Sequence, residues 1–324
     1  MLQMRFERLG GPETITEVEL PDPLPGPGEV RIDVRAISCN FADILIGQGK
    51  YQFKPELPFA PGSEVAGTVR DVGEGVDDLE PGTAVVAMLP FGGYASVVVA
   101  ARARVHAVPD GMAMEQAAAL GVAYQTAYLG LVERGHLARG ETLLVHAAAG
   151  GVGLAAVQVG KALGARVIAT ASSDEKLALA RRHGADEGIN YRDDGWQTRV
   201  LSLTDGRGAD VVYDPVGGET FHLSTKCIAF DGRIVIIGFA SGTIPEVKLN
   251  RVMLKNIAIT GLHIHAYREH APGKLRASMD ALLAMHARGD IEVAISARYP
   301  LRQAADALQA LSSRATVGKL ILEP

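Results

Sequence analysis

The chain has 324 residues, which is enough for two domains. Hydrophobic residues make up 48 % and charged residues 21 %, a composition that excludes a disordered chain. The net charge of −5 gives no general attraction to nucleic acid, and two cysteines are too few for a disulfide scaffold or a four-cysteine zinc lobe.

No targeting or membrane signal is visible in the sequence. The first eight residues (MLQMRFER) contain no apolar segment of signal-peptide length. Nor does the chain contain a run of about 18 uncharged apolar residues, which a membrane-spanning helix would need. We therefore expect a cytoplasmic protein without a membrane segment.

The first third of the chain is rich in predicted β-strands. Apolar and polar residues alternate, or β-branched residues cluster, in Glu29–Ala36, Val65–Val72, Val85–Leu89 and Tyr94–Ala100. Proline and glycine separate these segments, as in the run PDPLPGPG at 21–28. Several short strands at close spacing predict a partly open antiparallel barrel.

After Pro109 the pattern changes to one of alternating strands and helices. Met114–Arg134 is helical in character, and a regular alternation begins at Thr142. The predicted strands are Leu143–Ala147, Arg166–Ala171, Gly188–Tyr191, Asp210–Asp214 and Arg233–Gly238, and the predicted helices are Val152–Leu163, Asp174–His183, Trp196–Leu203 and Glu219–Ile228. This alternation predicts a parallel sheet covered by helices on both faces.

The end of the chain returns to a different pattern. Two helices, Gly273–Ala287 and Gln303–Ser312, precede a strand at Lys319–Leu322. A doubly wound unit inside a β-rich frame implies that the frame is discontinuous. We expect an inner domain at 123–264 and an outer domain made of 1–122 and 265–324.

The sharpest motif is the segment 145–153 (VHAAAGGVG), which follows a predicted strand and opens a predicted helix. The first turn of such a helix has unpaired backbone N–H groups and a dipole that favours an anion. Gly150 would let a pyrophosphate approach the backbone, and Gly153 would let the helix pack closely on the strand. The alternative is an ordinary glycine-rich turn. The predicted cofactor-binding residues here are Ala148, Gly150, Gly151, Val152 and Gly153.

The end of the second predicted strand indicates which nicotinamide cofactor is bound. NAD sites usually place Asp or Glu there to bind the ribose hydroxyl, but this strand ends in ATASS at 169–173. Small hydroxyls such as that of Ser172, with the nearby ammonium of Lys176, would bind a 2′-phosphate by donating hydrogen bonds to it. The sequence therefore favours NADPH over NADH, the alternative being that both residues belong to a solvated helix start.

Four segments together resemble the zinc-free quinone oxidoreductases of the medium-chain dehydrogenase/reductase superfamily. They are 39–43 (CNFAD), 61–67 (PGSEVAG), the 147–153 turn and 213–218 (YDPVGG), and the resemblance spans nearly the whole chain. It implies an α/β fold in which a Rossmann domain is inserted into a discontinuous GroES-like β-barrel domain. It further implies NADPH as the cofactor and a homodimer as the assembly.

The resemblance also assigns cofactor roles to individual residues. Lys176 and Tyr191 match positions that hold the 2′-phosphate, and Ser172 and Arg314 match positions in the same site. Backbone contacts on the nicotinamide side are implied for Gly238, Phe239, Ala240 and Leu262.

Four further residues match positions that line the nicotinamide and substrate site, namely Asn40, Asp43, Tyr51 and Thr126. We interpret them as the catalytic set, with Tyr51 or a water held by Asn40 as the proton donor. The alternatives are that Tyr51 and Thr126 only pack, and that Asn40 and Asp43 only brace a turn.

The sequence predicts no metal site. A catalytic zinc needs three protein ligands and an open position. In the places where zinc-dependent relatives carry ligands, this chain has Asn40, Ser63 and Val122, and the single carboxylate of Glu64 does not make a site. His263 and His265 are interpreted as packing or surface residues.

Without a set of metal ligands, the sequence offers no Lewis acid to stabilise an alkoxide. It therefore favours a substrate that stabilises its own negative charge when it accepts a hydride. The predicted function is NADPH-dependent reduction of a small quinone by direct hydride transfer. One alternative is reduction of an activated alkene (an enone, enal or enoyl thioester). Another, of a different class, is an NADPH-binding structural or RNA-binding protein, against which the acidic net charge argues.

Overall fold

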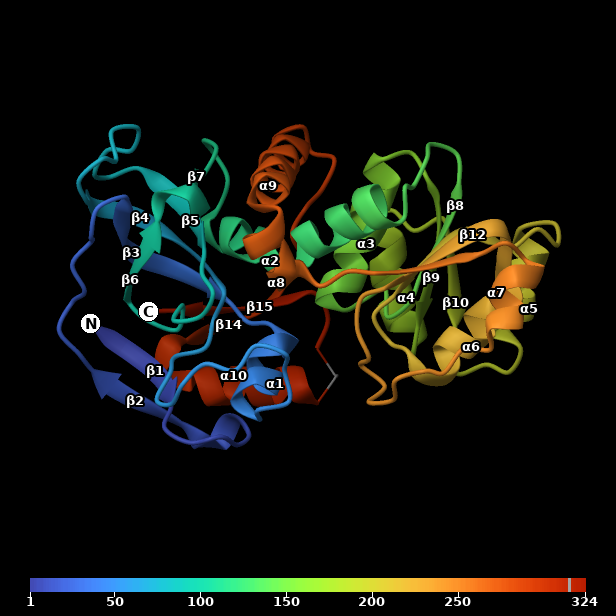
Figure 1. The fold of residues 1–324 in the computed structure, drawn as a ribbon, viewed down its shortest axis with the longest axis horizontal. Helices are drawn as coiled ribbons and strands as arrows, with labels where there is room; N and C mark the ends of the chain where they lie inside the picture. Colours follow the sequence, from blue (N-terminus) through green and yellow to red (C-terminus); the bar gives the residue numbers. More distant parts are fainter. Residues whose placement is uncertain (314–315) are drawn as a thin grey trace. The chain divides into compact units, whose positions relative to one another are not determined.

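The computed structural model describes residues 1–313 and 316–324, and packing divides it into two compact units (Figure 1). The first unit comprises Met1–Val122, Met279–Leu283 and Val293–Pro324. The second comprises Ala123–Ser278 and Ala284–Glu292. Residues 265–278 and 284–292 thus pack with the second unit, whereas the sequence analysis assigned them to the outer domain. The division into functional domains, with an outer domain of 1–122 and 265–324 and an inner domain of 123–264, stays a prediction.

The first unit is built on a seven-stranded sheet, mostly antiparallel. Its strand order is β14-β15-β3-β4-β5-β7, and β6 pairs with β3. The strands are β3 (Glu29–Ser38), β4 (Glu64–Val72), β5 (Ala84–Met88), β6 (Val97–Ala101), β7 (Val105–Ala107), β14 (Ile295–Pro300) and β15 (Lys319–Glu323). Because β15 pairs with β3, strands from before and after the second unit belong to one sheet, and the first unit is discontinuous, as predicted.

The remaining elements of the first unit surround that sheet. They are β1 (Leu2–Phe6), β2 (Ile15–Glu19), α1 (Phe41–Gly47) and α10 (Ala304–Ser312). The hairpin of β1 and β2, like β14, was not predicted. Buried apolar side chains from the sheet, the hairpin and the helices form one core, including Phe6, Ile32, Ile37, Tyr94 and Leu308.

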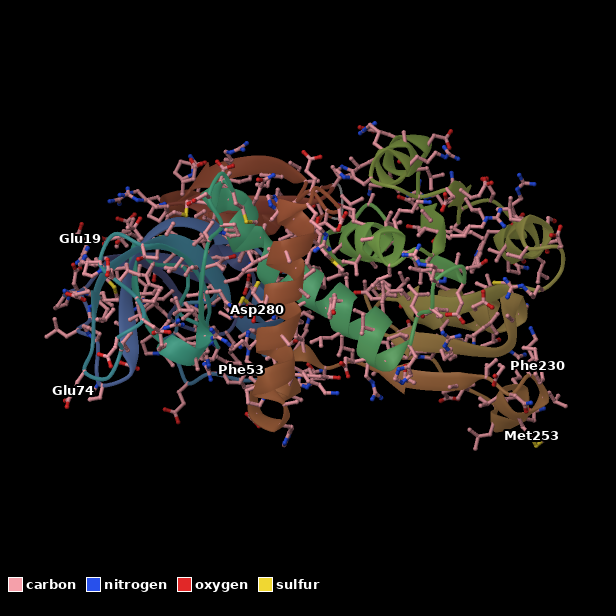
Figure 2. All side chains as sticks on the ribbon, turned by 90° about the horizontal axis from the view of Figure 1, so that it is seen from above. Glu19, Phe53, Glu74, Phe230, Met253 and Asp280 are labelled. Carbon is pink, nitrogen blue, oxygen red and sulfur yellow. The ribbon has the colours of Figure 1, made fainter. Side chains whose placement is uncertain are left out.

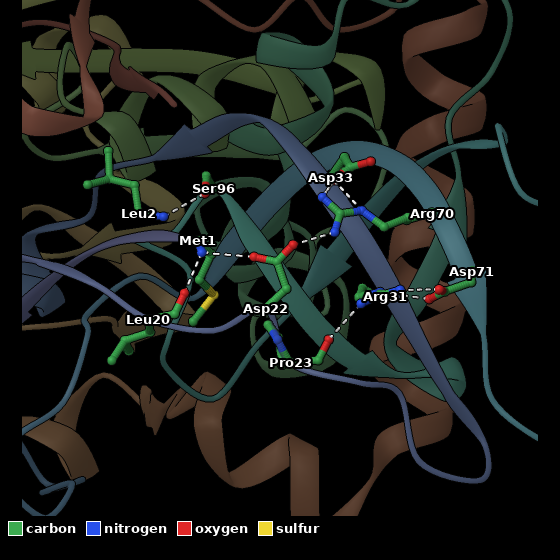
Figure 3. Close-up of polar contacts among 10 residues, drawn as sticks. All are labelled: Met1, Leu2, Leu20, Asp22, Pro23, Arg31, Asp33, Arg70, Asp71 and Ser96. Atoms are coloured by element: carbon green, nitrogen blue, oxygen red, sulfur yellow. Dashed lines mark hydrogen bonds and ion pairs between the residues drawn. The ribbon is translucent and has the colours of Figure 1, made fainter.

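An ion-pair network ties the segment after β2 to the sheet of the first unit (Figure 3). The Arg70 guanidinium binds Asp22 at 2.5 Å and also binds Asp33, while Arg31 binds Asp71. Asp22 also accepts from the N-terminal ammonium at 2.8 Å, and the hydrogen bonds from this ammonium and from Arg70 lower the pKa of Asp22 to about 2. Asp22 therefore stays ionised at any ordinary pH.

The second unit is a doubly wound α/β fold, which confirms the predicted fold class. Its six strands are all parallel, in the order β10-β9-β8-β11-β12-β13. They are β8 (Thr142–Val145), β9 (Arg166–Ala171), β10 (Glu187–Asn190), β11 (Ala209–Asp214), β12 (Ile228–Ile236) and β13 (Ala258–Gly261). Numbered from β8, this is the order 3-2-1-4-5-6, which places a ligand site at the carboxyl ends of β8 and β11, where the winding reverses.

The second unit also contains shorter helices, of which α3 to α7 connect its strands (Figure 1). They are α3 (Gly151–Ala162), α4 (Asp174–Arg182), α5 (Trp196–Leu203), α6 (Gly218–Cys227), α7 (Leu249–Leu254) and α8 (Ile264–His270). Two longer helices, α2 (Met114–Leu129) and α9 (Pro272–Ala287), each have residues assigned to both units. No helix among residues 1–313 and 316–324 has the length and apolar character needed to span a bilayer. The cytoplasmic location stays a prediction.

Candidate functional site

The turn from β8 into α3 has the geometry of a phosphate cradle. After Val145 the chain turns through Ala147, whose φ is +49°, and α3 begins after Gly150. A Cβ on Gly153 would lie 2.2 Å from the carbonyl oxygen of Ala147, so only glycine fits there. The first turn of α3 can therefore approach the end of the strand closely.

This turn leaves room and positive potential for an anion. A Cβ on Gly150 would meet only the Ala147 carbonyl oxygen, at 3.4 Å, so the position is open in the protein alone. The first turn of α3, which contains Gly151, Val152 and Gly153, carries no acidic residue. Its N–H groups have no acceptor within the helix and attract a phosphate. Ala148 is buried and donates its N–H to Thr170 of β9.

His146, the first residue after β8, fixes the start of this turn through hydrogen bonds of its ring, a role that the sequence did not reveal. The ring is fully buried between the hydroxyls of Thr170, 2.9 Å from Nδ1, and Ser224, 2.8 Å from Nε2. Ser224 already donates to the Thr220 carbonyl at 2.7 Å, so Nε2–H must be the donor to Ser224 and Nδ1 accepts from Thr170. Burial lowers the pKa of His146, which favours the neutral ring, and the two hydroxyls select this tautomer. The ring thereby joins the ends of β8 and β9 to α6.

Three predicted cofactor residues come directly after the neighbouring strands β9 and β10 or in the helix that follows β9. The N–H of Tyr191, directly after β10, donates to the carbonyl of Ala171 at the end of β9, 3.1 Å away. Ser172 follows Ala171 and is half-buried, while the Tyr191 side chain is 40 % exposed. Ser173 caps α4 by accepting from the N–H of Lys176. The structure therefore brings Ser172, Lys176 and Tyr191 to one edge of the sheet; Arg314 lies outside the described residues.

The predicted nicotinamide contacts lie at the carboxyl edge of the same sheet. Asp214, the last residue of β11, accepts from the N–H groups of Val216 and Gly217 at 2.8 and 2.9 Å. After β12, Gly238 donates to the Asp214 carbonyl and Ala240 to that of Pro215. Exposed Phe239 and buried Leu262, which follows β13, complete this set of residues.

The predicted catalytic residues Asn40 and Asp43 are neighbours at the start of α1 in the first unit. Asp43 is buried, and its Oδ2 accepts from the Asn40 N–H at 2.8 Å and from the Tyr94 hydroxyl at 3.2 Å. Its Oδ1 accepts from the Gly62 N–H at 3.2 Å. Burial raises the pKa of Asp43 to about 6, although these hydrogen bonds oppose the rise. Asp43 thus braces the turn that carries Asn40.

The Asn40 side chain belongs to a buried charged cluster that includes a residue missed by the sequence analysis. Its Nδ2 donates to Glu64 Oε1 at 2.8 Å, and its Oδ1 accepts from Lys319 Nζ at 2.7 Å. Lys319 was predicted only as a strand residue. Its partners lie 255 and 279 residues away along the chain, so no local pattern could have revealed it.

Tyr51 and Thr126, the other two residues of the predicted catalytic set, lie in different units. Tyr51 is partly buried and packs against the core of the first unit. Thr126 lies on α2 in the second unit and is 7 % exposed. Their catalytic roles stay a prediction.

Two family models match the chain. One, described as an alcohol dehydrogenase GroES-like domain, covers residues 26–110, and one described as a zinc-binding dehydrogenase covers residues 151–282. The donors present do not fit a zinc ion, which needs three Cys, His or carboxylate ligands. In the part of the chain that the structure describes, no three such side chains gather, and the Glu64 carboxylate is already bound by the Lys319 ammonium.

Full-length relatives and solved structures agree with this assignment. The chain is 41 % identical to a quinone oxidoreductase of Pseudomonas aeruginosa over 99 % of both chains. It is 38 % identical to quinone oxidoreductase-like protein 2 of Rattus norvegicus, over 96 % of this chain and 89 % of the relative. The structure of Escherichia coli quinone oxidoreductase complexed with NADPH has a TM-score of 0.93 and 35 % identity to this chain, and the match covers 100 % of each chain. The structure of a mycobacterial protein complexed with NADPH has a TM-score of 0.92 and 37 % identity, also over 100 % of each chain. The chain therefore belongs to the quinone oxidoreductase family of the medium-chain dehydrogenase/reductase superfamily.

Proposed function

We propose that this oxidoreductase uses NADPH to reduce a small quinone by direct hydride transfer, without a metal ion. The observation that carries the proposal is the carboxyl edge of the second unit's sheet. There the open turn at Gly150 follows β8, and Ser172, Lys176 and Tyr191 follow the neighbouring strands β9 and β10. The E. coli and mycobacterial structures complexed with NADPH support the cofactor assignment.

Each region of this edge would bind one part of the cofactor. The N-terminus of α3 would bind the pyrophosphate through backbone N–H groups. Lys176, with Ser172 and Tyr191, would bind the 2′-phosphate, because the end of β9 carries no carboxylate to repel it. Asp174 and Glu175 follow in α4 but are exposed. The backbone at 238–240 and Leu262 would contact the nicotinamide side.

When bound, NADPH supplies the hydride. A quinone becomes an aromatic hydroquinolate on accepting it, so the protein needs to supply mainly proximity, orientation and a proton. Asn40, Asp43, Tyr51 and Thr126 are the proposed residues of the acceptor site. Because the Asn40 amide is engaged with Glu64 and Lys319, we favour Tyr51 over an Asn40-bound water as the proton donor.

The proposal is tested by NADPH and NADH oxidation with 1,4-benzoquinone and, side by side, with a simple enone. We expect turnover with the quinone and a clear preference for NADPH. If the enone is reduced faster than the quinone, the substrate class is an activated alkene and the quinone proposal is wrong. Tight NADPH binding without hydride transfer to any acceptor would favour the structural or RNA-binding alternative.

Lys176→Glu should reduce the preference for NADPH over NADH by about 10-fold or more. A hydrogen bond between charged groups contributes ~1.5–3 kcal/mol, and 1.4 kcal/mol corresponds to about a tenfold change in affinity. Lys226→Glu is the matched control, because it reverses the charge of an exposed lysine in the same unit. Equal kcat/KM for NADPH and NADH in the wild type would contradict the 2′-phosphate assignment.

We further propose that the chain forms a homodimer through one end of the second unit. Phe230, Leu249, Met253 and Leu254 are 70, 76, 69 and 72 % exposed, and Phe230 and Met253 lie at the same end (Figure 2). In the described part of the chain, β13 is an edge strand that pairs with β12 alone. An unpaired edge beside exposed apolar side chains is suited to a second copy.

Replacing both Met253 and Leu254 with glutamate should shift the protein from dimer to monomer in light scattering after size exclusion. Burying two carboxylates in an apolar interface carries a large desolvation cost. Leu24→Glu, at a residue that is 78 % exposed in the first unit, should remain dimeric. If the variant with glutamate at both 253 and 254 stays dimeric, the dimer interface does not lie at this end of the second unit.

A further inference from the structure

A fully buried carboxylate in the first unit links residues from four elements. Glu64, at the start of β4, accepts from Asn40 Nδ2 at 2.8 Å, from the Val122 N–H at 2.5 Å and from Lys319 Nζ at 3.0 Å. Asn40 precedes α1, Val122 lies in α2 and Lys319 opens β15. A buried charge is tolerated only when it is paired and hydrogen-bonded, and Glu64 meets both conditions.

The partner cation is equally enclosed. Lys319 is 5 % exposed, and its ammonium donates to Glu64 Oε1 at 3.0 Å, to Asn40 Oδ1 at 2.7 Å and to the Cys39 carbonyl at 3.1 Å. An ammonium has three N–H donors, so all of them are engaged within the protein. Lys319 has no proton left to donate to a substrate, and any effect it has on the reaction must act through its neighbours.

These two charges determine which way the Asn40 amide points. An ammonium can only donate, so the amide oxygen must face Lys319. An ionised carboxylate can only accept, so the amide nitrogen must face Glu64. Turning the amide around would set its oxygen against the carboxylate and its NH₂ against the ammonium, losing two hydrogen bonds to charged groups.

We propose that Lys319 is a positioning residue for the quinone reaction. Together with Glu64 it holds the amide of Asn40 in one orientation, and through the Cys39 carbonyl it also holds the backbone that leads into α1. This inference rests on the proposed function, in which Asn40 belongs to the acceptor site. It also explains why the Glu64 carboxylate, which lies beside Asn40 and Ser63, is not available to a metal ion.

Substitutions at Lys319 and Glu64 can separate the effect of an unpaired buried charge from the effect of the Asn40 amide orientation. Lys319→Met alone leaves the Glu64 carboxylate buried without its counter-ion and should destabilise the fold. Combining Lys319→Met with Glu64→Gln removes both charges. The new amide at position 64 can still accept from the Val122 N–H through its oxygen, and its nitrogen then faces Asn40 and favours the reversed Asn40 amide.

The experiment compares the wild type, Lys319→Arg, Lys319→Met and the double variant Lys319→Met/Glu64→Gln. The readouts are melting temperature, NADPH affinity, and kcat and KM for 1,4-benzoquinone. The matched control is Arg298→Met/Glu115→Gln, which removes an exposed ion pair of the same unit. That control should keep wild-type kinetics.

We expect the double variant to melt near the wild type and to bind NADPH normally. Its kcat should fall about 10-fold or more, because the Asn40 amide is then held in the reversed orientation at the acceptor site. Lys319→Arg, which keeps the charge, should recover part of the kcat that Lys319→Met loses. A double variant with wild-type kcat would overturn the proposal, and so would a Lys319→Arg variant that is no more active than Lys319→Met.

A second readout does not depend on turnover. The side-chain ¹⁵N amide signal of Asn40, assigned from its loss in Asn40→Asp, should shift in the double variant and stay in place in the Arg298→Met/Glu115→Gln control. An unshifted signal would contradict the positioning role. A wild-type protein that reduces no acceptor would contradict the proposed function alone, because the amide signal would still decide the role of Lys319.

Discussion

Replacing Gly153 with valine is expected to weaken NADPH binding by about 100-fold or more and to lower the melting temperature. The new Cβ would lie 2.2 Å from the Ala147 carbonyl oxygen and 2.9 Å from the Ala148 Cα, so α3 or the turn must move. Overpacking of this kind costs typically ~1–3 kcal/mol, and the displaced helix start no longer aims its N–H groups at the pyrophosphate. Fluorescence titration with NADPH and a thermal melt measure the two effects.

Gly150→Ala separates binding from folding in the same turn. Its Cβ would meet only the Ala147 carbonyl oxygen at 3.4 Å, an ordinary contact, so we expect a wild-type melting temperature. The added methyl group occupies the space through which the phosphate approaches, and NADPH affinity should fall. A Gly150→Ala protein that binds NADPH as tightly as the wild type would contradict the placement of the pyrophosphate.

Replacing Asp43 with asparagine should reduce the free energy of unfolding at pH 7.5 by about 1–3 kcal/mol. The two oxygens of Asp43 accept three hydrogen bonds, from Asn40, Gly62 and Tyr94. Asparagine has a single acceptor oxygen, and its NH₂ group would face a backbone N–H that then lacks a partner. Urea denaturation measures the loss, and Asp77→Asn, at an exposed position, should show none.

The same residue makes a signed contribution to the pH dependence of stability. Burial raises the pKa of Asp43 from 3.8 to about 6, so the folded protein takes up a proton at a higher pH than the unfolded chain does. The stability from this group is fully present below pH 3.8 and is lost as the pH rises through about 6. Between pH 4.5 and 7.5 the wild type should therefore lose stability relative to Asp43→Asn. A constant difference between the two proteins over this range would contradict the raised pKa.

Much of the second unit was predictable because its signals are local. The strand–glycine–helix motif at 145–153 and the strand end at 169–173 each lie within a few residues, and the structure places both at one edge of the sheet. The edge strand β13 was missed because its four residues, AITG, carry no periodicity. The prediction for β12 began too late, at Arg233, because Asp231 with φ of +62° and Gly232 interrupt the strand pattern without ending the strand.

The candidate site in the first unit was less predictable because long-range contacts build it. The motif at 39–43 identified Asn40 and Asp43 by resemblance, but not what binds them. The contacts show that Asp43 braces its turn, which was the alternative interpretation, and they leave its catalytic role a proposal. Lys319 reaches Asn40 only because β15 pairs with β3, a pairing between opposite ends of the chain.

The most direct test of the central claim is a single-turnover reaction without oxygen. The protein, loaded with NADPH and treated with a chelator, is mixed with 1,4-benzoquinone, and the experiment is repeated with deuterium at the transferred position of the cofactor. The account predicts one hydroquinone for each NADPH consumed, no effect of the chelator and slower oxidation of the deuterated cofactor. Bound NADPH that stays reduced, or activity that the chelator abolishes and a metal ion restores, would contradict it.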